Sequence, residues 1–261
     1  MHEMSKQVTL AEAVRRTVRD GMQVHFSLTH NRAHAAVFEL ARQFRDKHSI
    51  DLVASGLLEY ASVLVSAGAV RNTESAFAGN TFPAPGPSRV MGAFLNGDGA
   101  HDPDWTNYTV AVRLMAGALG WPFAPTHSLI RSDLAHGPGR AIVANPFGDG
   151  EAMLVAPIVP DVAFVHASVA DTRGNAFTPG PNAENLWGAW AAKTVVVTAE
   201  RVVSPEEFAA LGPHPGFPGQ KVSFVAEARY GAHPQSLIST PSLGVESYVE
   251  DYALREELTR L

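Results

Sequence analysis

The sequence predicts an α/β fold with a mainly parallel central sheet and helices on both of its faces. First, short apolar segments alternate with segments of helical periodicity along the chain. Second, residues 162–167, 182–192 and 193–200 have the patterns of a strand, a helix and a strand, which form a β-α-β unit. Third, 46% of the 261 residues are hydrophobic and 18% are charged, which suits a sizeable buried core. No repeat or linker divides the chain, so we expect one domain over residues 1–261.

The first 28 residues are expected to form a helix and a strand. Residues 8–20 place apolar side chains at helical spacing, and Thr9 with Glu12 three positions later has the pattern of a capping box. Gly21 is expected to end this helix, because glycine adopts a positive φ most easily. The apolar segment 22–28 is then expected to be a buried strand.

A second helix and a second strand follow. The helix is expected over residues 33–44, after an opening at Thr29 or Asn31, and a short strand is expected over residues 49–55. A further helix-like stretch runs through Ala67. The apolar side of the second helix is expected to consist of Ala35, Phe38, Leu40 and Ala41.

The rest of the chain contains one long stretch with weak structural signals. Residues 78–103 are rich in glycine and proline, and such a long irregular stretch in a compact domain is often functional. Residues 108–119 predict a helix, and the segment 121–125 then forces an extended backbone through its prolines. Residues 248–261 predict an amphipathic C-terminal helix.

The composition argues against several classes of function. The net charge of −6 and the scattered Lys and Arg residues give no basis for binding nucleic acid. The absence of cysteine excludes disulfides, thiolate metal sites and a cysteine nucleophile in this chain. No metal site is expected, because His30, four residues before His34, falls in a predicted loop. The apolar stretch 109–125 carries Arg113, so no membrane span is predicted and a cytoplasmic protein is expected.

Five stretches carry a resemblance to a known family, in the same order along the chain. They are DGMQVHFSLTHNR (20–32), GWPFAPTHS (120–128), VPDVAFVHASVADTRGNAF (159–177), AAKTVVVTAE (191–200) and GAHP (231–234). From Leu10 to about Tyr252 the chain resembles the A subunits of class I CoA-transferases, such as the glutaconate and 3-oxoacid enzymes. It also resembles their relatives that hydrolyse or decarboxylate CoA thioesters. The resemblance implies the CoA-transferase (NagB/RpiA-like) fold.

Structural roles compete with substrate contact for several residues of these stretches. Asp171, Gly174 and Asn175 follow a predicted strand and suit a turn, in which Asp caps and Gly and Asn supply unusual φ values. His166 would then be a core histidine, and His233 would hold a loop. The remaining candidates for structural roles, as solvated strand ends, are Lys193 and Glu200.

The resemblance implies covalent catalysis with acyl-CoA as substrate and no bound cofactor. In the class I mechanism a glutamate carboxylate attacks the thioester, an acyl-glutamyl anhydride forms, and the CoA thiolate returns to make an enzyme–CoA thioester. An acceptor carboxylate then takes the CoA, and preorganised donors stabilise the oxyanions. In two-subunit members this glutamate belongs to the B chain, and no similar segment occurs here. The resemblance therefore implies a partner, a homologous B (beta) subunit, in an α2β2 heterotetramer.

The loop after the first predicted strand departs from the family pattern. That loop is usually rich in glycine, whereas residues 27–32 of this chain contain none. Ser27, Thr29 or His30 would supply side-chain donors instead, with His30 a candidate catalytic residue. Arg32 keeps its place in the family pattern as a substrate- or CoA-binding candidate, and its alternative role is a surface helix cap.

A second group of substrate- or CoA-binding candidates lies further along the chain. His127 stands where the family often has arginine, and unlike arginine it titrates near neutral pH. Thr126 and Ser128 flank it. Gly79 and Asn80, at the start of the glycine- and proline-rich stretch, complete the expected set.

Three hypotheses follow from these departures. The first is a CoA-transferase that exchanges CoA between an acyl-CoA and a carboxylate. The second is a hydrolase, C–C bond hydrolase or decarboxylase that acts on a carboxylated acyl-CoA. The third is a non-catalytic scaffold for a catalytic B chain. A B chain with the nucleophilic glutamate supports the first, and a B chain without it supports the second.

Asp104 is the second catalytic candidate, because it lies eighteen residues before Pro122, where many A subunits have a glutamate. Its alternative role is to cap the helix that begins near Thr106. If Asp104 transfers a proton, Asp104→Asn should lower the turnover of the reconstituted enzyme by about a hundred- to ten-thousand-fold. If Asp104 caps the helix instead, the loss of that cap would cost about 0.5–2 kcal/mol of stability. Turnover and thermal melting of both proteins separate these outcomes, and a rate change below about threefold removes Asp104 from the catalytic residues.

Overall fold

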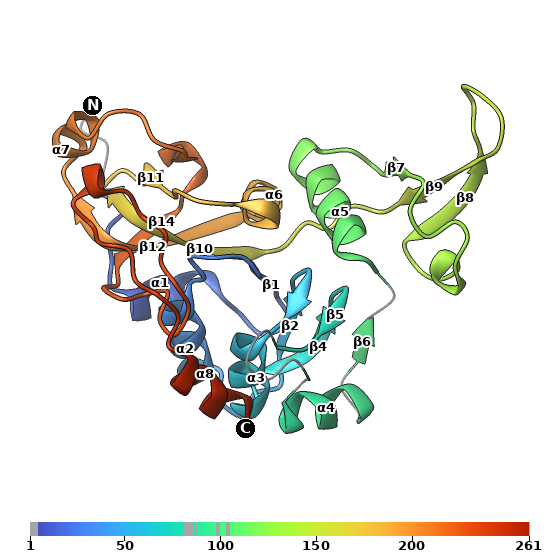
Figure 1. Cartoon of the computed structure of the whole chain (residues 1–261), viewed down its shortest axis with the longest axis horizontal. Helices are drawn as coiled ribbons and strands as arrows, with labels where there is room; N and C mark the ends of the chain where they lie inside the picture. The colour runs from blue at the N-terminus through green and yellow to red at the C-terminus, as the bar shows by residue number, and fades with distance from the viewer. Residues whose placement is uncertain (1–4, 81–85, 87, 98–99, 103–104, 261) are drawn as a thin grey trace.

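The computed structural model describes residues 5–80, 86, 88–97, 100–102 and 105–260. Within these residues, a nine-stranded sheet forms the centre of the molecule, and a three-stranded sheet extends from one end (Figure 1). Asp104 lies outside the described residues, so its catalytic role stays a prediction. Its alternative role as a helix cap is wrong, because Thr106 caps the helix that follows.

Seven strands of the central sheet run parallel, which confirms the predicted fold class. In spatial order they are β6 (Ala100–Asp102), β4 (Val70–Glu74), β2 (Ile50–Val53), β1 (Gln23–Phe26), β10 (Val162–Asp171), β12 (Thr194–Val203) and β14 (Phe224–Glu227). Two short antiparallel strands, β11 (Ala176–Phe177) and β13 (Gly216–Phe217), continue the sheet from the far end of β10. Every residue of β10 is buried, as expected for a strand covered on both faces.

Helices cover both faces of this sheet (Figure 1). One face carries α1 (Leu10–Thr17), α2 (His34–Gln43) and α3 (Glu59–Ser66), whose apolar residues share a core cluster with β1, β2 and β4. The other face carries α5 (Asn107–Leu119) and α6 (Ala183–Ala191), which pack on each other. The predicted arrangement of helices on both faces is therefore confirmed.

The remaining elements are short. The three-stranded antiparallel sheet consists of β7 (Ala124–Thr126), β9 (Glu151–Val155) and β8 (Arg140–Ala144), with the 3-10 turn η1 (Asp133–Ala135) between β7 and β8. The others are β3 (Gly56–Leu57), β5 (Phe77–Ala78), α4 (Arg89–Asn96), α7 (Pro205–Ala210), η2 (Gly219–Lys221), η3 (Pro241–Leu243) and α8 (Tyr252–Thr259). No helix in the described part of the chain has the length and apolar character needed to span a bilayer.

The first predicted helix has the expected start and a different end. The Thr9 side chain accepts a hydrogen bond from the Glu12 amide at 3.2 Å, so the N-cap is confirmed. Gly21 has the expected positive φ of 83°. The helix itself ends earlier, at Thr17, because Val18 already has an extended backbone.

The second helix differs from its prediction in both its start and its buried face. It begins at His34, since Asn31 adopts a left-handed φ of 56° and belongs to the preceding loop. Phe38, expected on the apolar side, is 41% exposed. The apolar residues that this helix buries are Ala36, Val37, Leu40 and Ala41. The C-terminal helix is also shorter than predicted, because Asp251 caps it and Tyr248 remains outside.

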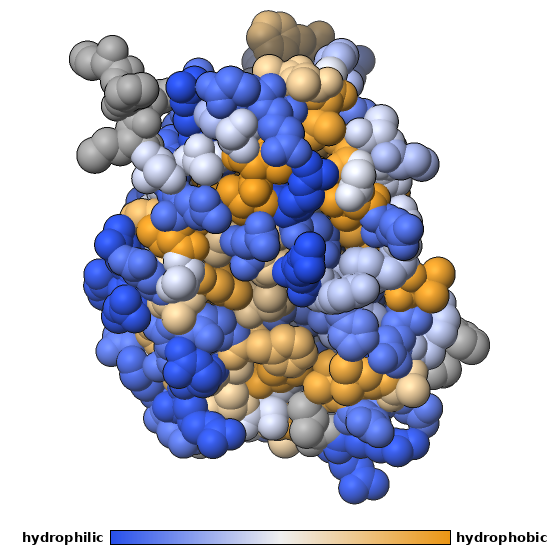
Figure 2. Space-filling view, turned by 90° about the vertical axis from the view of Figure 1, so that its left-hand side faces the viewer, coloured by the Kyte–Doolittle hydropathy of each residue, from blue (hydrophilic) through white to orange (hydrophobic). Residues whose placement is uncertain are grey.

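The surface on the left of Figure 1 is mostly hydrophilic, with smaller apolar areas between the polar side chains (Figure 2). Single apolar side chains are normal on a protein surface and need no special explanation.

Two helical glycines give a matched test of the packing of α5. A Cβ at Gly117 would lie 2.0 Å from the carbonyl oxygen of Ile158, whereas a Cβ at Gly92 in α4 would meet nothing within 4 Å. We expect Gly117→Ala to destabilise the protein, because two backbones would have to separate. Gly92→Ala should instead stabilise it by about 0.5–1 kcal/mol through the lower entropy of the unfolded chain. Urea denaturation of both variants measures the two signs, and a neutral Gly117→Ala would contradict the close packing.

Candidate active site

The topology of the central sheet places the loop after β1 at the usual ligand position of open α/β sheets. From β1 the chain proceeds to β2 on one side, and it later returns to β10 on the other side. The strand order therefore reverses between β1 and β10. Ligands of such sheets bind at the carboxyl ends of the strands where this reversal occurs. Residues 27–32, which follow β1, occupy this place.

The first half of this loop is closed by its own hydroxyl groups. Ser27, which is buried, accepts a hydrogen bond from the Thr29 amide at 3.1 Å, and the two hydroxyls lie 2.8 Å apart. The Leu28 amide donates to Oε1 of Glu184 in α6 at 2.8 Å. The hydroxyls predicted as donors are thus present at the sheet edge, paired with each other.

The buried side chain of Arg32 holds the loop through hydrogen bonds. Its side chain is 6% exposed, so the alternative of a surface helix cap is wrong. Nε donates to the carbonyl oxygen of Leu28 at 2.8 Å, and Nη2 donates to the same oxygen. Nη1 donates to Oε1 of Glu59 at 2.5 Å. Arg32 therefore joins the start of the loop to α3.

Glu59 was missed by the sequence reasoning, although it is an acidic residue within the otherwise apolar stretch LLEYASVLV. It is fully buried, and Nε2 of Gln235 donates to its Oε1 at 3.2 Å. Nη2 of Arg255 lies 3.6 Å from its Oε2, and Nε2 of His34 lies 3.5 Å from its Oε1. Burial alone would raise the pKa of Glu59, but Arg32, His34 and Arg255 outweigh it and hold this pKa well below its usual range.

The second half of the loop is bound by the C-terminal part of the chain. The side chain of His30 is exposed, and its Nδ1 lies 2.9 Å from Oγ of Ser236. The Asn31 amide donates to the carbonyl oxygen of Ser236 at 3.3 Å. The Asn31 side chain accepts from the Ile238 amide at 2.7 Å and donates to the Ile238 carbonyl oxygen at 3.1 Å. Nε2 of His30 has no hydrogen-bond partner among the described residues, so this nitrogen is available to a substrate.

Gly79 and Asn80 lie next to the segment that leads to Glu59. The Gly79 amide donates to the carbonyl oxygen of Leu57 at 2.9 Å. Asn80 is buried, and its Nδ2 donates to the carbonyl oxygen of Gly86 at 2.9 Å. Both residues therefore lie beyond the carboxyl ends of β2 and β4, at the same edge of the sheet as the loop of residues 27–32.

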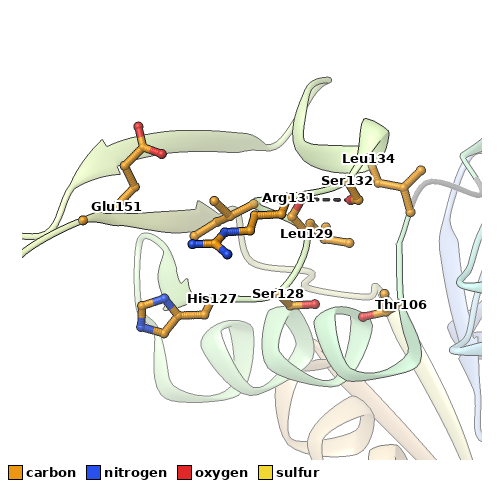
Figure 3. Close-up of a pocket in the computed structure, with 10 residues that line it drawn as sticks. Thr106, His127, Ser128, Leu129, Arg131, Ser132, Leu134 and Glu151 are labelled. Carbon is orange, nitrogen blue, oxygen red and sulfur yellow. Dashed lines mark hydrogen bonds between the residues drawn. The ribbon is translucent and has the colours of Figure 1, made fainter.

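Thr126, His127 and Ser128 belong to a different part of the molecule, at the end of β7 and apart from β1 (Figure 1). His127 and Ser128 line a cavity of about 670 Å³ together with Thr106, Arg131 and Glu151 (Figure 3). Thr126 is buried, and its hydroxyl accepts from the Ser128 amide at 3.0 Å. The candidates thus form two groups rather than one.

A second buried network surrounds His166 and Glu200. His166 is fully buried between Oγ1 of Thr198 and Oε1 of Glu200, each 2.9 Å from a ring nitrogen, which confirms its role as a core histidine. Glu200 also accepts from the amides of Tyr230 and Gly231 and from the hydroxyl of Tyr248. Burial alone would raise the pKa of Glu200, but His166, Tyr248 and the Tyr230 amide lower it. The expectation of a solvated strand end is therefore wrong for Glu200.

Two further motif residues have structural roles, as the alternative interpretation predicted. Oδ1 of Asp171 accepts from the amides of Arg173 and Asn175 at 2.9 Å, which closes a turn. Nε2 of His233 lies 3.1 Å from Oδ2 of Asp251, the residue that caps α8. These motif residues therefore hold turns and a helix end, and the catalytic role of the loop of residues 27–32 stays a prediction.

A family model described as coenzyme A transferase matches residues 7–223 of the chain. The chain belongs to this family. Over 88% of its length it is 28% identical to the A subunit of glutaconate CoA-transferase of Acidaminococcus fermentans, of which it covers 77%. It is 30% identical to the A subunit of 3-oxoadipate CoA-transferase of Pseudomonas knackmussii, over 88% of this chain and 82% of that protein. Two homologues of this CoA-transferase family member are thus A subunits of CoA-transferases.

Another relative is longer. An uncharacterized protein of Archaeoglobus fulgidus is 27% identical over 88% of this CoA-transferase-family chain, which spans only 51% of that protein.

Two solved structures resemble the fold over nearly the whole chain. Glutaconate coenzyme A-transferase from Acidaminococcus fermentans superimposes with a TM-score of 0.85 at 24% identity, covering 98% of this chain and 85% of that one. A variant of the decarboxylase AibA/AibB superimposes with a TM-score of 0.79 at 28% identity, covering 98% and 94%. The predicted CoA-transferase fold is therefore confirmed, and the family includes a decarboxylase.

The buried ionisable groups predict that acid destabilises the folded chain. Burial lowers the pKa of His25 and of His34 from the ordinary value of 6.5, and the pKa values of Glu59 and Glu200 also lie below their ordinary 4.5. In all four cases the unfolded chain takes up a proton at a higher pH than the folded chain. The stability they contribute is therefore complete above the unfolded pKa and is lost as the pH falls.

We expect the melting temperature to fall as the pH is lowered from about 7.5 to 5, through protonation of the two histidines in the unfolded chain, and to fall further near pH 4. Thermal melts followed by circular dichroism in buffers of equal ionic strength measure this. A melting temperature that stays constant between pH 7.5 and 5 would contradict the assignment of the histidines as buried and neutral.

Proposed function

We propose that this chain is the A subunit of a heteromeric CoA-transferase that moves CoA between an acyl-CoA thioester and a carboxylate. The acyl site lies at the interface with a homologous B subunit in an α2β2 assembly, and the complex works in the cytoplasm. The family membership and the A-subunit homologues support the activity. The observation that carries the proposal is the absence of an available carboxylate in the loop of residues 27–32, at the ligand position of the sheet.

The carboxylates around this loop are poor nucleophiles. Glu59 is fully buried and held by Arg32, with its pKa far below the usual range. Glu184 is buried and accepts the Leu28 amide. A carboxylate fixed in this way has little access to a thioester carbon and little basicity. Neither carboxylate suits the attack that class I transfer requires, which supports a nucleophile from another chain.

The loop supplies donors rather than the nucleophile. We assign the exposed imidazole of His30 to hydrogen bonding or proton transfer at the acyl group, and the hydroxyl of Ser27 to a donor that stabilises the oxyanion. Arg32, Gly79 and Asn80 shape the sheet edge beside it. The cavity beside β7 offers the Arg131 cation and the hydroxyls of Ser128 and Thr106, with His127 beside them, to the anionic part of the thioester.

Decarboxylation is the second candidate function. It is favoured by the likeness to AibA/AibB at 28% identity over 98% of this chain. The replacement of the expected glycines in the loop by Ser27, Thr29 and His30 points in the same direction, because the loop then departs from the pattern of the transferases. The B chain decides between the two reactions, since only transfer requires its nucleophilic glutamate.

The deciding experiment is co-expression of this chain with a homologous B chain encoded beside it. We expect the two to elute together from a size-exclusion column at the mass of α2β2. The complex should transfer CoA from acetyl-CoA to a dicarboxylic acid, with glutaconate and 3-oxoadipate as first acceptors because two relatives carry these names. Equal activity of the chain alone would contradict the need for a partner. Release of CO2 from a carboxylated acyl-CoA, such as glutaconyl-CoA supplied as substrate, without transfer would favour decarboxylation.

The same assay tests the loop. Ser27→Ala and His30→Ala should each lower turnover by about tenfold or more while the melting temperature changes little, because both act on the acyl group. His136→Ala, an exposed histidine outside both residue groups, is the matched control and should keep full turnover. Normal turnover of the loop variants together with a large loss of stability would make the loop structural.

A further inference from the structure

The buried carboxylate of Glu59 is approached from four separate parts of the chain. Arg32 comes from the loop after β1, His34 from the start of α2, Gln235 from the segment that follows the GAHP turn, and Arg255 from α8. The pairs of Glu59 with Gln235 and Arg255 are separated by 176 and 196 residues, so only the folded chain brings them together. Arg255 is also paired with Glu250, just before α8.

Arg32 links this cluster to the backbone of the loop. One edge of its guanidinium donates twice to the Leu28 carbonyl oxygen, and Nη1 donates to Glu59. Only the planar fork of arginine can satisfy both partners at once. The position of Leu28, between the hydroxyl residues Ser27 and Thr29, therefore depends on where Glu59 holds the guanidinium.

The loop needs such a support because it lacks glycine and contains a strained residue. Asn31 has a left-handed φ of 56°, a conformation that persists in a residue other than glycine only where its surroundings fix it. Residues 236–238 fix Asn31 from one side through the hydrogen bonds described above. On the other side, Arg32 is fixed by Glu59, which Gln235 of the same C-terminal segment contacts.

We propose that Glu59 is a positioning residue that holds the loop of residues 27–32 in its active geometry through Arg32, and that the C-terminal segment 235–255 holds Glu59 in turn. The proposal rests on the assignment of this loop to the acyl site. Glu59 itself does not touch the substrate, because it is fully buried. A loop displaced by about 1 Å lowers turnover by up to a hundredfold without a matching change in substrate binding.

The first test is hydrogen exchange in the full chain, without substrate. The amides of Leu28, Thr29 and Asn31 are hydrogen-bonded in the loop, and their exchange reports its order. We expect Glu59→Gln to speed their exchange by about tenfold or more relative to the amides of β10 and β12. Gln235→Leu, which removes one hydrogen bond from an uncharged donor to Glu59 and leaves both arginines in place, should do the same to a smaller extent. If Glu59→Gln does not fold, the exchange measured in Gln235→Leu tests the role of Glu59 in ordering the loop.

A double-mutant cycle separates positioning from general stabilisation. If Glu59 acts through Arg32, the double variant Arg32→Gln, Glu59→Gln should show the loop exchange of Arg32→Gln alone rather than the sum of two effects. Asp171→Asn is the matched control, because Asp171 is also a buried carboxylate but holds a turn elsewhere. Additive effects in the cycle, or exchange that rises equally in the loop and in β10, would overturn the proposal.

Kinetics of the complex with the B chain give the second readout. With acetyl-CoA and glutaconate as substrates, Glu59→Gln and Gln235→Leu should lower kcat by about tenfold or more while KM for acetyl-CoA stays within about threefold. Asp171→Asn should leave kcat per folded enzyme unchanged. A normal kcat in Glu59→Gln would overturn the positioning role. Absence of thioester turnover in the wild-type complex would instead contradict the proposed function. The exchange experiment would still test whether Glu59 orders the loop, because it needs no turnover.

Discussion

The parallel pairing of β1 with β2 on one side and with β10 on the other directs the rest of the chain. Because both neighbours run parallel to β1, each connection must cross a face of the sheet, and helices cover both faces as a result. The same pairing aligns the carboxyl ends of the strands, so the loops that follow β1, β2 and β4 share one edge. The loop of residues 27–32 owes its place to this arrangement before any of its side chains is considered.

The sheet and most helices could be predicted because their signals are local. A continuous apolar run such as residues 162–167 indicates a buried strand by itself, and Thr9 with Glu12 marks a helix start by itself. The start of α2 was misplaced because the left-handed backbone of Asn31 is imposed by residues 236–238, more than two hundred positions away. The exposure of Phe38 likewise follows from which helix face meets the sheet, and the apolar pattern of that segment suits more than one face.

The candidate site was predicted less completely for the same reason. The loop after the first strand was identified from its order in the family pattern, and the structure places that loop at the strand reversal. The sequence marks Glu59 only as an acid in an apolar stretch and Glu200 only as the end of a strand, because an acidic residue in a sequence does not reveal its partners. Their partners, Arg32 and Arg255 for Glu59 and His166 and Tyr248 for Glu200, become neighbours only through tertiary packing. Sequence reasoning could note an acid in an apolar helix, but it could not tell a buried, ion-paired acid from one that faces solvent.

The contacts between the C-terminal segment and the loop at residue 30 also bear on how the protein is made. During synthesis β1 and its loop leave the ribosome long before Gln235, Ser236, Ile238 and Arg255 do. Until then Glu59 lacks Gln235 and Arg255, two of its four partners, and Asn31 lacks the hydrogen bonds that Ser236 and Ile238 supply. A nascent chain therefore cannot present a finished site to a thioester or to a partner chain. The site is complete only once the chain as far as Arg255 has emerged and folded back onto the loop.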